Sequence, residues 1–157
     1  MSLKIDTTSW NFIEGFERLV LEKPNAFACL NKTEQINYHT LNARANQLAH
    51  YIKKYCQHIE APIVVLVPRS THFLIALLAI FKRGCCLVPI DVNYPQAYAE
   101  KIISAIQPSI IITQNEWAQW ASIVIADATV IDIDNEAIQK QPLEHVTVEV
   151  LPQNLAC

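Results

Sequence analysis

The chain has 157 residues, of which 52% are hydrophobic and 17% charged, with a formal net charge of -3. This length supports one domain with a buried core, and the composition excludes intrinsic disorder. The lysines and arginines form no basic stripe along the sequence, so we expect no nucleic-acid partner. The longest apolar runs, such as residues 73–81, are far shorter than the roughly 20 residues that span a bilayer, so we expect a cytoplasmic protein with no membrane partner.

The N-terminal third of the sequence predicts a helix, a hairpin and a second helix. Apolar residues recur at helical spacing in both helical segments, and Asn37 is placed to cap the second. Two short runs on either side of the turn at 31–33 predict an antiparallel hairpin. The predicted elements are a helix over 10–23, strands over 26–30 and 34–37, and a helix over 38–57.

The middle of the chain predicts a β-α-β unit. Residues 62–67 form a continuous β-branched run, which is typical of a strand buried on both faces. A helix over 71–83, apolar almost all round, separates it from a second buried strand over 85–90. We expect these two strands to be parallel and their crossover to be right-handed.

The ends of that central helix carry their own signals. Ser70 is placed to cap its first turn. Lys82 and Arg83 lie in the last turn, where cations complement the helix dipole. Gly84 fits the left-handed position that ends a helix.

The remaining sequence continues the alternation of helices and strands and then loses its pattern. Trp117 and Trp120 fall on a predicted short helix or turn, and the pattern weakens from Asn135 onward. The predicted elements are a helix over 96–106 and strands over 109–113, 123–125 and 130–133. The fold class is therefore α/β, with a mostly parallel sheet flanked by helices, a small N-terminal hairpin, and one domain over 1–157.

Glycine is scarce, because only Gly15 and Gly84 occur in the whole sequence. Loops that cradle phosphate need several glycines, since their backbone approaches the phosphate closely and adopts positive φ. The sequence therefore contains neither a Walker loop nor a G-x-G-x-x-G fingerprint.

Ligands of open α/β sheets bind beyond the carboxyl ends of the strands, where Arg69 and Asp91 are expected. Arg69 could meet a phosphate, but a surface or subdomain contact is the preferred interpretation. Asp91 could be catalytic, but a turn or capping role is preferred, because aspartate commonly binds its own backbone. Neither residue is assigned a catalytic or cofactor-binding role.

The spacing of the histidines and cysteines predicts no metal site. The histidines are scattered, without a ligand cluster or a G-x-S-x-G motif, so a Ser-His-Asp triad has weak support. The cysteines lack a C-x-x-C pair, and the adjacent Cys85 and Cys86 fall in a predicted buried strand, which favours a core role. The residues concerned are His39, His50, His58, His72, His145, Cys29, Cys56, Cys85, Cys86 and Cys157.

Several segments resemble, in order, the core motifs of adenylate-forming enzymes, most closely the amino-acid adenylation domains of nonribosomal peptide synthetases. Residues 36–41 are similar to "L-T/S-Y-x-E-L", and residues 42–49 to "N-x-R-A-N-x-L-A". Residues 77–91 resemble "LKAGxAYVPID". Tyr94-Pro95 and residues 107–113 resemble "Y-P…Q-P-x-x-x-x-T". Departures occur at Thr40, Arg83, Cys86, Leu87, Ala97 and Tyr98.

The resemblance implies an N-terminal subdomain that ends just before the family's phosphate loop, because residues 153–157 resemble the segment preceding that loop. The intact family enzyme uses ATP and Mg²⁺ to make an aminoacyl adenylate and then passes the acyl group to a carrier thiol. The resemblance places those sites later in the family's sequence, so this chain is expected to hold no cofactor and to be inactive alone. Its expected partner is the remainder of the adenylation domain.

Two alternatives stay open. A free-standing truncated homologue could act as a binding or assembly module and self-associate through an exposed sheet edge. An unrelated small nucleotide-binding α/β protein is a third interpretation, and the glycine count argues against it.

Overall fold

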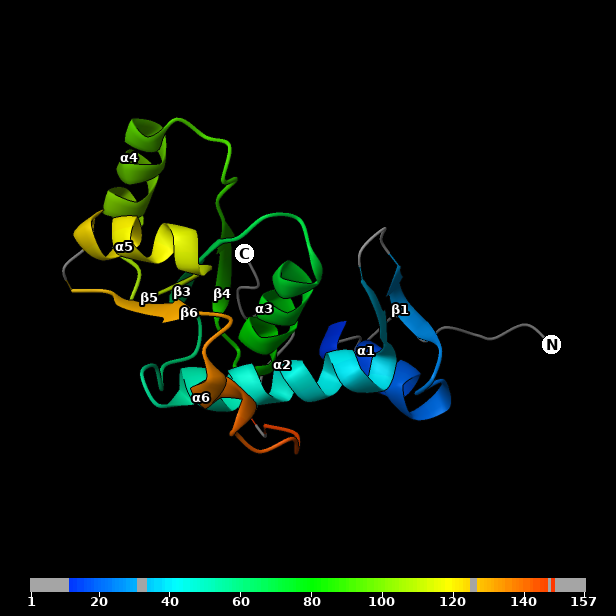
Figure 1. The fold of residues 1–157 in the computed structure, drawn as a ribbon. Helices are drawn as coiled ribbons and strands as arrows, with labels where there is room; N and C mark the ends of the chain where they lie inside the picture. The colour runs from blue at the N-terminus through cyan, green and yellow to red at the C-terminus, as the bar shows by residue number, and fades with distance from the viewer. Residues whose placement is uncertain (1–11, 31–33, 125–126, 147, 149–157) are drawn as a thin grey trace.

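The computed structural model describes residues 12–30, 34–124, 127–146 and 148. Its elements alternate as the sequence predicts, and Figure 1 shows their arrangement. The helices are α1 (Phe12–Glu22), α2 (Tyr38–Lys53), α3 (Thr71–Lys82), α4 (Gln96–Ile106), α5 (Asn115–Val124) and α6 (Glu136–Gln139). The strands are β1 (Phe27–Leu30), β2 (Gln35–Asn37), β3 (Pro62–Leu66), β4 (Cys86–Pro89), β5 (Ile110–Thr113) and β6 (Thr129–Asp132).

The predicted sheet is confirmed as a four-stranded parallel sheet in the order β4-β3-β5-β6, and β1 and β2 form the predicted antiparallel hairpin. The chain moves from β3 outward to β4 and then returns past β3 to β5 and β6. The direction of winding thus reverses between β3 and β5. A doubly wound sheet places its crevice at such a reversal.

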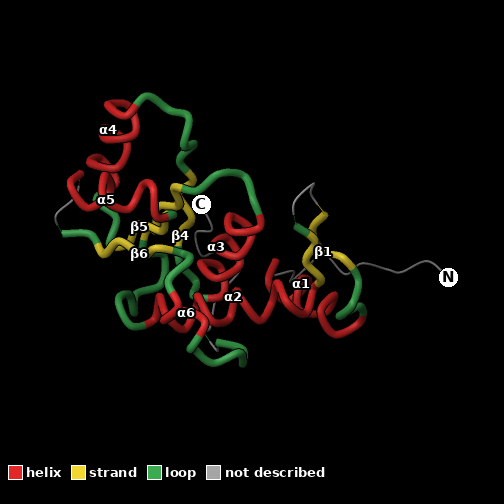
Figure 2. Tube along the Cα trace, viewed as in Figure 1, coloured by secondary structure: helices red, strands yellow, loops and turns green. Residues whose placement is uncertain are grey.

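Helices cover both faces of this sheet, giving three layers (Figures 1 and 2). Alternate residues of β3 divide between the layers: Ile63 and Val65 join the core formed with α1, α2 and α3, whereas Val64 and Leu66 join the core formed with α4 and α5. All four side chains are buried. A strand covered on both faces reads as a continuous apolar run, which is why the sequence identified β3.

Gly84 ends α3 as predicted. Its φ of 64° is left-handed, the Gly84 N–H donates to the Phe81 carbonyl at 2.9 Å, and the Cys85 N–H donates to the Ile80 carbonyl at 3.1 Å. This pair of bonds is a Schellman motif, which satisfies carbonyls that the helix end leaves free.

We expect Gly84→Ala to lower the free energy of unfolding by about 1 kcal/mol, because a Cβ is unfavourable in the left-handed region. Gly15→Ala is the matched control. Gly15 lies inside α1, so alanine there should raise the free energy of unfolding by roughly 0.5–1 kcal/mol. Urea denaturation followed by circular dichroism measures both changes, and a stabilised Gly84→Ala variant would contradict the assignment.

The segment 139–144, here called the strap, is held to α2 by bonds to its backbone. Asn46 donates from Nδ2 to the Leu143 carbonyl at 2.7 Å. Gln47 donates from Nε2 to the carbonyls of Gln139 and Gln141 at 2.5 and 3.2 Å. His50 Nε2 lies 3.0 Å from the carbonyl oxygen of Glu144. The strap is thereby fixed along the polar side of α2.

Two local predictions were wrong. The predicted strand over 123–125 does not form where it is described, since Ile123 and Val124 end α5 and residue 125 lies outside the described residues. Ser70 occupies the N-cap position of α3 but does not cap it, because its hydroxyl donates to the Pro68 carbonyl at 3.0 Å. Lys82 does lie in the last turn of α3, but its side chain is buried and pairs with Glu17 of α1.

One further element differs from the prediction, and one predicted helix cap is confirmed. The short helix α6 was not anticipated, whereas Asn37 caps α2 as predicted, its Oδ1 accepting from the Thr40 N–H at 2.8 Å.

Within the described residues, no helix has the length and hydropathy needed to cross a bilayer.

Candidate functional site

A cleft of about 1080 Å³ opens at the carboxyl edge of the sheet. Its walls come from the segments that follow β3 and β4, from the start of α3, and from β1 of the hairpin. Its lining residues are Cys29, Val67, Pro68, Arg69, Ser70, Phe73, Leu74, Pro89, Ile90, Asp91, Val92, Asn93 and Tyr94. The cleft thus gathers both residues, Arg69 and Asp91, that the sequence placed at this edge.

Asp91 makes a turn with its own backbone, as preferred from the sequence. Its Oδ1 accepts from the Asn93 backbone N–H at 2.9 Å and from the Asn93 side-chain amide at 2.8 Å. These two hydrogen bonds, and more weakly the charge of Arg69, lower the pKa of the Asp91 carboxyl below its ordinary value. Asp91 therefore remains an exposed, ionised carboxylate near neutral pH, which suits a turn or a cation contact and does not suit a general acid.

We expect Asn93→Ala to raise the pKa of Asp91 toward its ordinary value, because the side-chain hydrogen bond to the carboxylate is lost. Since the folded pKa is lowered, this carboxylate stabilises the fold above its unfolded pKa, and the contribution disappears as pH falls through the folded pKa. Nuclear magnetic resonance titration of the Asp91 carboxyl measures the shift. An unchanged or lower midpoint in the variant would contradict the geometry.

The carboxyl ends of β3 and β5 are joined by a side-chain hydrogen bond. Thr113, the last residue of β5, is fully buried and donates from its hydroxyl to the Leu66 carbonyl at 3.0 Å. This bond joins the carboxyl ends of the two strands between which the winding reverses. The Thr113 hydroxyl is therefore engaged with a backbone carbonyl and holds the two strand ends together.

A second polar group at the same edge was not found from the sequence. His72, at the start of α3, lies 3.0 Å from Asp134 between Nε2 and Oδ1, and Gln114 donates to the other carboxylate oxygen at 3.2 Å. A smaller pocket of about 430 Å³ borders His72 and Asp134. The signal available in the sequence was the position of Asp134 just after β6, but its partner on α3 depends on the strand order.

The histidine–carboxylate pair is not part of a nucleophilic triad within the described residues. The neighbouring Ser70 hydroxyl is hydrogen-bonded to a backbone carbonyl, and no described serine hydroxyl is hydrogen-bonded to a histidine. Across the same part of the chain, no three histidine, cysteine or carboxylate side chains gather in a way that could hold a metal ion.

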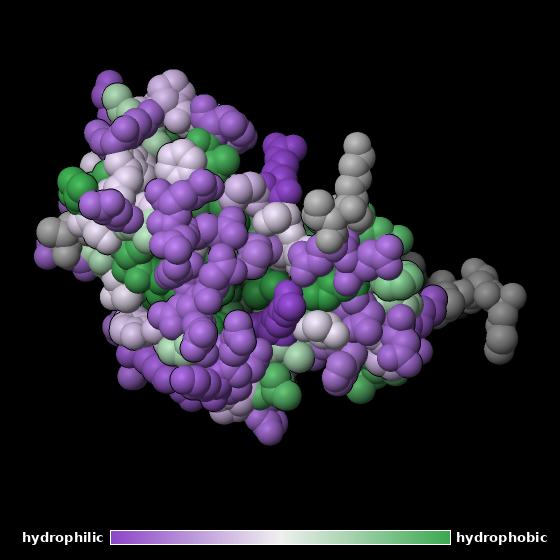
Figure 3. Space-filling view, viewed as in Figure 1, coloured by the Kyte–Doolittle hydropathy of each residue, from purple (hydrophilic) through white to green (hydrophobic). Residues whose placement is uncertain are grey.

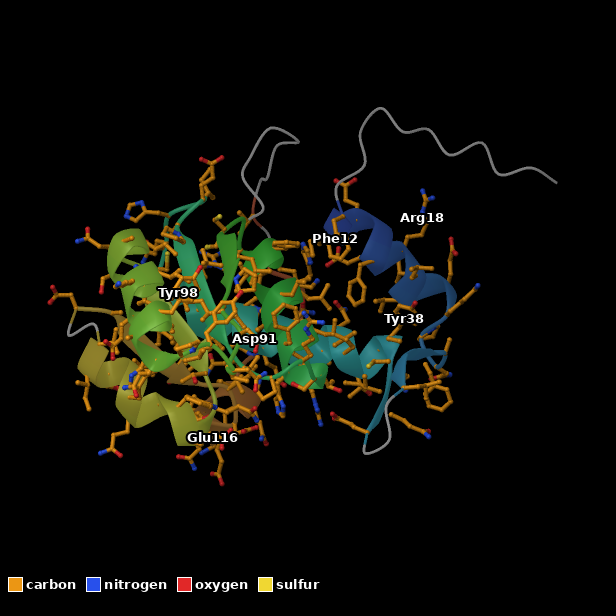
Figure 4. All side chains as sticks on the ribbon, turned by 90° about the horizontal axis from the view of Figure 1, so that it is seen from above. Phe12, Arg18, Tyr38, Asp91, Tyr98 and Glu116 are labelled. Carbon is orange, nitrogen blue, oxygen red and sulfur yellow. The ribbon has the colours of Figure 1, made fainter. Side chains whose placement is uncertain are left out.

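Of the labelled side chains, Asp91 lies apart from Phe12 of α1 and Tyr38 of α2 in Figure 4. Figure 4 shows Asp91 and Tyr98 over the sheet, whereas Phe12 and Tyr38 lie at the end of the molecule that carries α1. Tyr98 stacks edge-on against Tyr94 with ring centroids 5.2 Å apart. Phe12 packs against Phe81 of α3 in the same manner, at 5.6 Å. The aromatic contacts at the α1 end therefore serve packing.

Comparison with known proteins identifies the family. The family model described as "AMP-binding enzyme" matches residues 16–155. A linear gramicidin synthase of Brevibacillus parabrevis is 36% identical over 141 residues, which cover 90% of this chain and 3% of that protein. Tyrocidine synthase 3 of the same organism is 32% identical over 152 residues, covering 95% of this chain and 2% of that protein. The chain thus spans only a small fraction of the length of these relatives.

Solved structures show the same fold. The nonribosomal peptide synthetase FmoA3, in a form bound to α-methyl-L-serine-AMP, aligns with a TM-score of 0.87 at 17% identity, covering 96% of this chain and 16% of that one. The N-terminal subdomain of NpsA from Klebsiella oxytoca aligns with a TM-score of 0.75 at 20% identity, covering 91% and 36%. The chain belongs to the AMP-binding enzyme family, and its fold is that of the first part of the N-terminal subdomain of adenylate-forming enzymes.

Proposed function

We propose that this chain is scaffold for an amino-acid-activating ligase of nonribosomal peptide synthesis and does not adenylate an amino acid by itself. The observation that carries the proposal is the carboxyl edge of the sheet. There the ends of β3 and β5 are joined by the bond from Thr113 to Leu66, and the charged residues that line the cleft are Arg69 and Asp91. Asp91 accepts two hydrogen bonds from Asn93 in a turn, and the Ser70 hydroxyl is bonded to the Pro68 carbonyl, so among the described residues of the cleft neither side chain is paired with a histidine.

The glycine content supports the same proposal. Gly15 lies inside α1 and Gly84 ends α3, so neither glycine of the sequence is available for a phosphate-binding loop. In the intact ligase, ATP and Mg²⁺ would convert an amino acid to its adenylate, and a carrier thiol would then take the acyl group. The resemblance to the synthetases named above supports this assignment of the parent activity.

Amino-acid-dependent exchange of pyrophosphate into ATP tests the proposal. The purified chain, incubated with ATP, Mg²⁺ and the proteinogenic amino acids in turn, should give no exchange above the blank, while an active adenylation domain serves as the positive control. Exchange that depends on one amino acid, and that Arg69→Ala and Asp91→Ala reduce, would overturn the proposal.

The partner that we propose is the remainder of the adenylation domain. Apolar side chains remain exposed on α1 and β1: Leu21 is 84% exposed, Leu30 61% and Phe27 58%. Figure 3 shows a mostly hydrophilic face with several smaller hydrophobic patches, some of them at the end of the molecule that carries α1 and the hairpin. Clusters of exposed apolar residues are typical of contact surfaces.

The same exposed residues favour a second candidate role, a free-standing assembly module that self-associates. Within the described residues, the outer strands β4 and β6 each pair with a neighbouring strand on one side only. Sedimentation of the purified chain over a wide concentration range distinguishes the two roles. A concentration-dependent dimer supports self-association, and a monomer at all concentrations rejects it.

A further inference from the structure

Two buried thiols meet where the segment after α2 packs against the start of β4. Cys56 follows α2, and Cys85 lies between Gly84 and β4. Cys56 is 4% exposed and Cys85 is 1% exposed. Both thiols donate to one acceptor, the carbonyl oxygen of His58, at Sγ–O distances of 3.7 Å for Cys56 and 3.6 Å for Cys85. The two thiols also form a side-chain hydrogen bond with each other, which makes them direct neighbours although their residues are far apart in the sequence.

The guanidinium of Arg83 lies in the same cluster. Its Nη2 donates to the Cys56 carbonyl at 3.3 Å, and the residue is 5% exposed. Its Nε has no hydrogen-bond partner among the described residues. A buried cation with an unpartnered donor is costly unless negative charge compensates it. When a thiolate forms in this cluster during reaction, the guanidinium stabilises it.

We propose that Cys56 and Cys85 are a redox-sensitive pair that forms a reversible disulfide when the folded protein meets a small disulfide oxidant. The bond would join the segment after α2 to the corner between α3 and β4. This inference does not depend on the proposed function, because it rests on the thiols, the shared carbonyl and Arg83 alone.

The reaction is two thiol–disulfide exchanges. The thiolate of one cysteine attacks a sulfur of the small disulfide, forms a mixed disulfide and releases one small thiolate. The thiolate of the other cysteine then attacks the protein sulfur of that mixed disulfide, which closes the Cys56–Cys85 bond and releases the second small thiolate. The protein loses two protons and two electrons, and the oxidant gains them as two thiols.

The surroundings of Cys85 set the pace of this reaction. Burial raises the pKa of its thiol to about 12, and neighbouring Cys56 adds to the rise, whereas the charge of Arg83 opposes it. Since only the thiolate reacts, the pair stays reduced for long periods near neutral pH, and oxidation accelerates as pH rises. A step limited by the Cys85 thiolate speeds up about tenfold per pH unit between pH 7 and 9. Because both thiols are buried, the oxidant reaches them through local opening.

The test uses the folded chain carrying Cys157→Ser, since Cys157 lies outside the described residues. The chain is incubated with excess oxidised glutathione at several pH values, then digested without reduction and analysed by mass spectrometry. We expect a peptide pair joined through Cys56 and Cys85, with the loss of two hydrogen atoms, formed faster at higher pH and reversed by dithiothreitol.

Matched variants make the test specific. Cys29→Ser and Cys86→Ser should leave the linked pair intact, whereas Cys56→Ser and Cys85→Ser should each abolish it. Arg83→Gln should slow its formation several-fold at fixed pH, because the guanidinium no longer stabilises the Cys85 thiolate. The proposal is overturned if the folded chain keeps both thiols free under conditions that oxidise the urea-unfolded chain, or if the linkage uses Cys86.

Discussion

Replacing Glu17 with leucine is expected to lower the free energy of unfolding by about 3 kcal/mol, because it leaves a buried ammonium without its carboxylate. The Lys82 side chain is fully buried, and its Nζ pairs with Glu17 Oε1 across the contact between α3 and α1. His145 also contacts that oxygen, with its Nδ1 at 2.6 Å. Glu17 is 29% exposed, so some water remains near the pair, and the expected loss lies at the lower end of the range for buried ion pairs.

A double-mutant cycle separates this pair from general effects on α1. Adding Lys82→Met to Glu17→Leu should recover most of the lost free energy, since the double variant contains no unpaired buried charge. Glu14→Leu is the matched control on the exposed side of α1 and should change the free energy by less than about 0.5 kcal/mol. Urea denaturation of the wild type, Glu17→Leu, Lys82→Met, the double variant and the Glu14→Leu control provides the measurement. If the double variant is as unstable as Glu17→Leu alone, the stability that Glu17 provides does not come from its ion pair with Lys82.

Shortening Ile111 to alanine is the second large effect, with an expected loss of about 3 kcal/mol in the free energy of unfolding. Ile111 lies in β5, an inner strand of the sheet, and is fully buried in the core formed with α4 and α5. The loss combines the transfer of the removed methyl groups with the cavity that remains, because neighbouring side chains collapse only partly into the space.

Ile123 offers a matched control, since it is 76% exposed at the end of α5. Ile123→Ala should change the free energy by less than about 0.5 kcal/mol, and Ile111→Val should cost roughly 0.5–1.5 kcal/mol. Thermal and urea denaturation check the series. Equal losses for the two alanine variants would mean that β5 is not buried as the structure describes.

The sequence predicted the strands of the sheet because burial on both faces leaves an unambiguous signal. Residues 62–66 and 110–113 read as short β-branched runs, and both are strands of the sheet. Gly84 was equally readable, since the end of a helix requires a left-handed residue that glycine accepts at little cost.

Predictions failed where tertiary contacts decided between local alternatives. The apolar run that begins at Ile123 was assigned to a strand, but Trp117, Trp120 and Ala121 pack against the sheet at helical spacing and extend α5 to Val124. The four-residue α6 is too short to show a period. Its start is fixed by Asn135, whose side chain accepts from the Ala137 N–H at 2.9 Å.

Only part of the candidate site was predicted, because some of its contacts depend on tertiary arrangement. Arg69 and Asp91 follow two strands directly, so the parallel arrangement alone placed them at one edge. The contacts of Lys82 with Glu17 and of His72 with Asp134 join residues more than 60 positions apart. Such pairs depend on the order of strands and helices, which hydrophobic periodicity does not specify.

The way the strap is held to α2 predicts that strap positions tolerate substitution better than the α2 residues that bind it. Asn46 and Gln47 bind carbonyl oxygens, which every amino acid possesses, and the Leu143 side chain remains 57% exposed. Saturation mutagenesis should therefore find the exposed strap positions permissive and the two α2 amides restrictive. Over evolutionary time, this part of the surface can diversify while its path across the molecule stays constant.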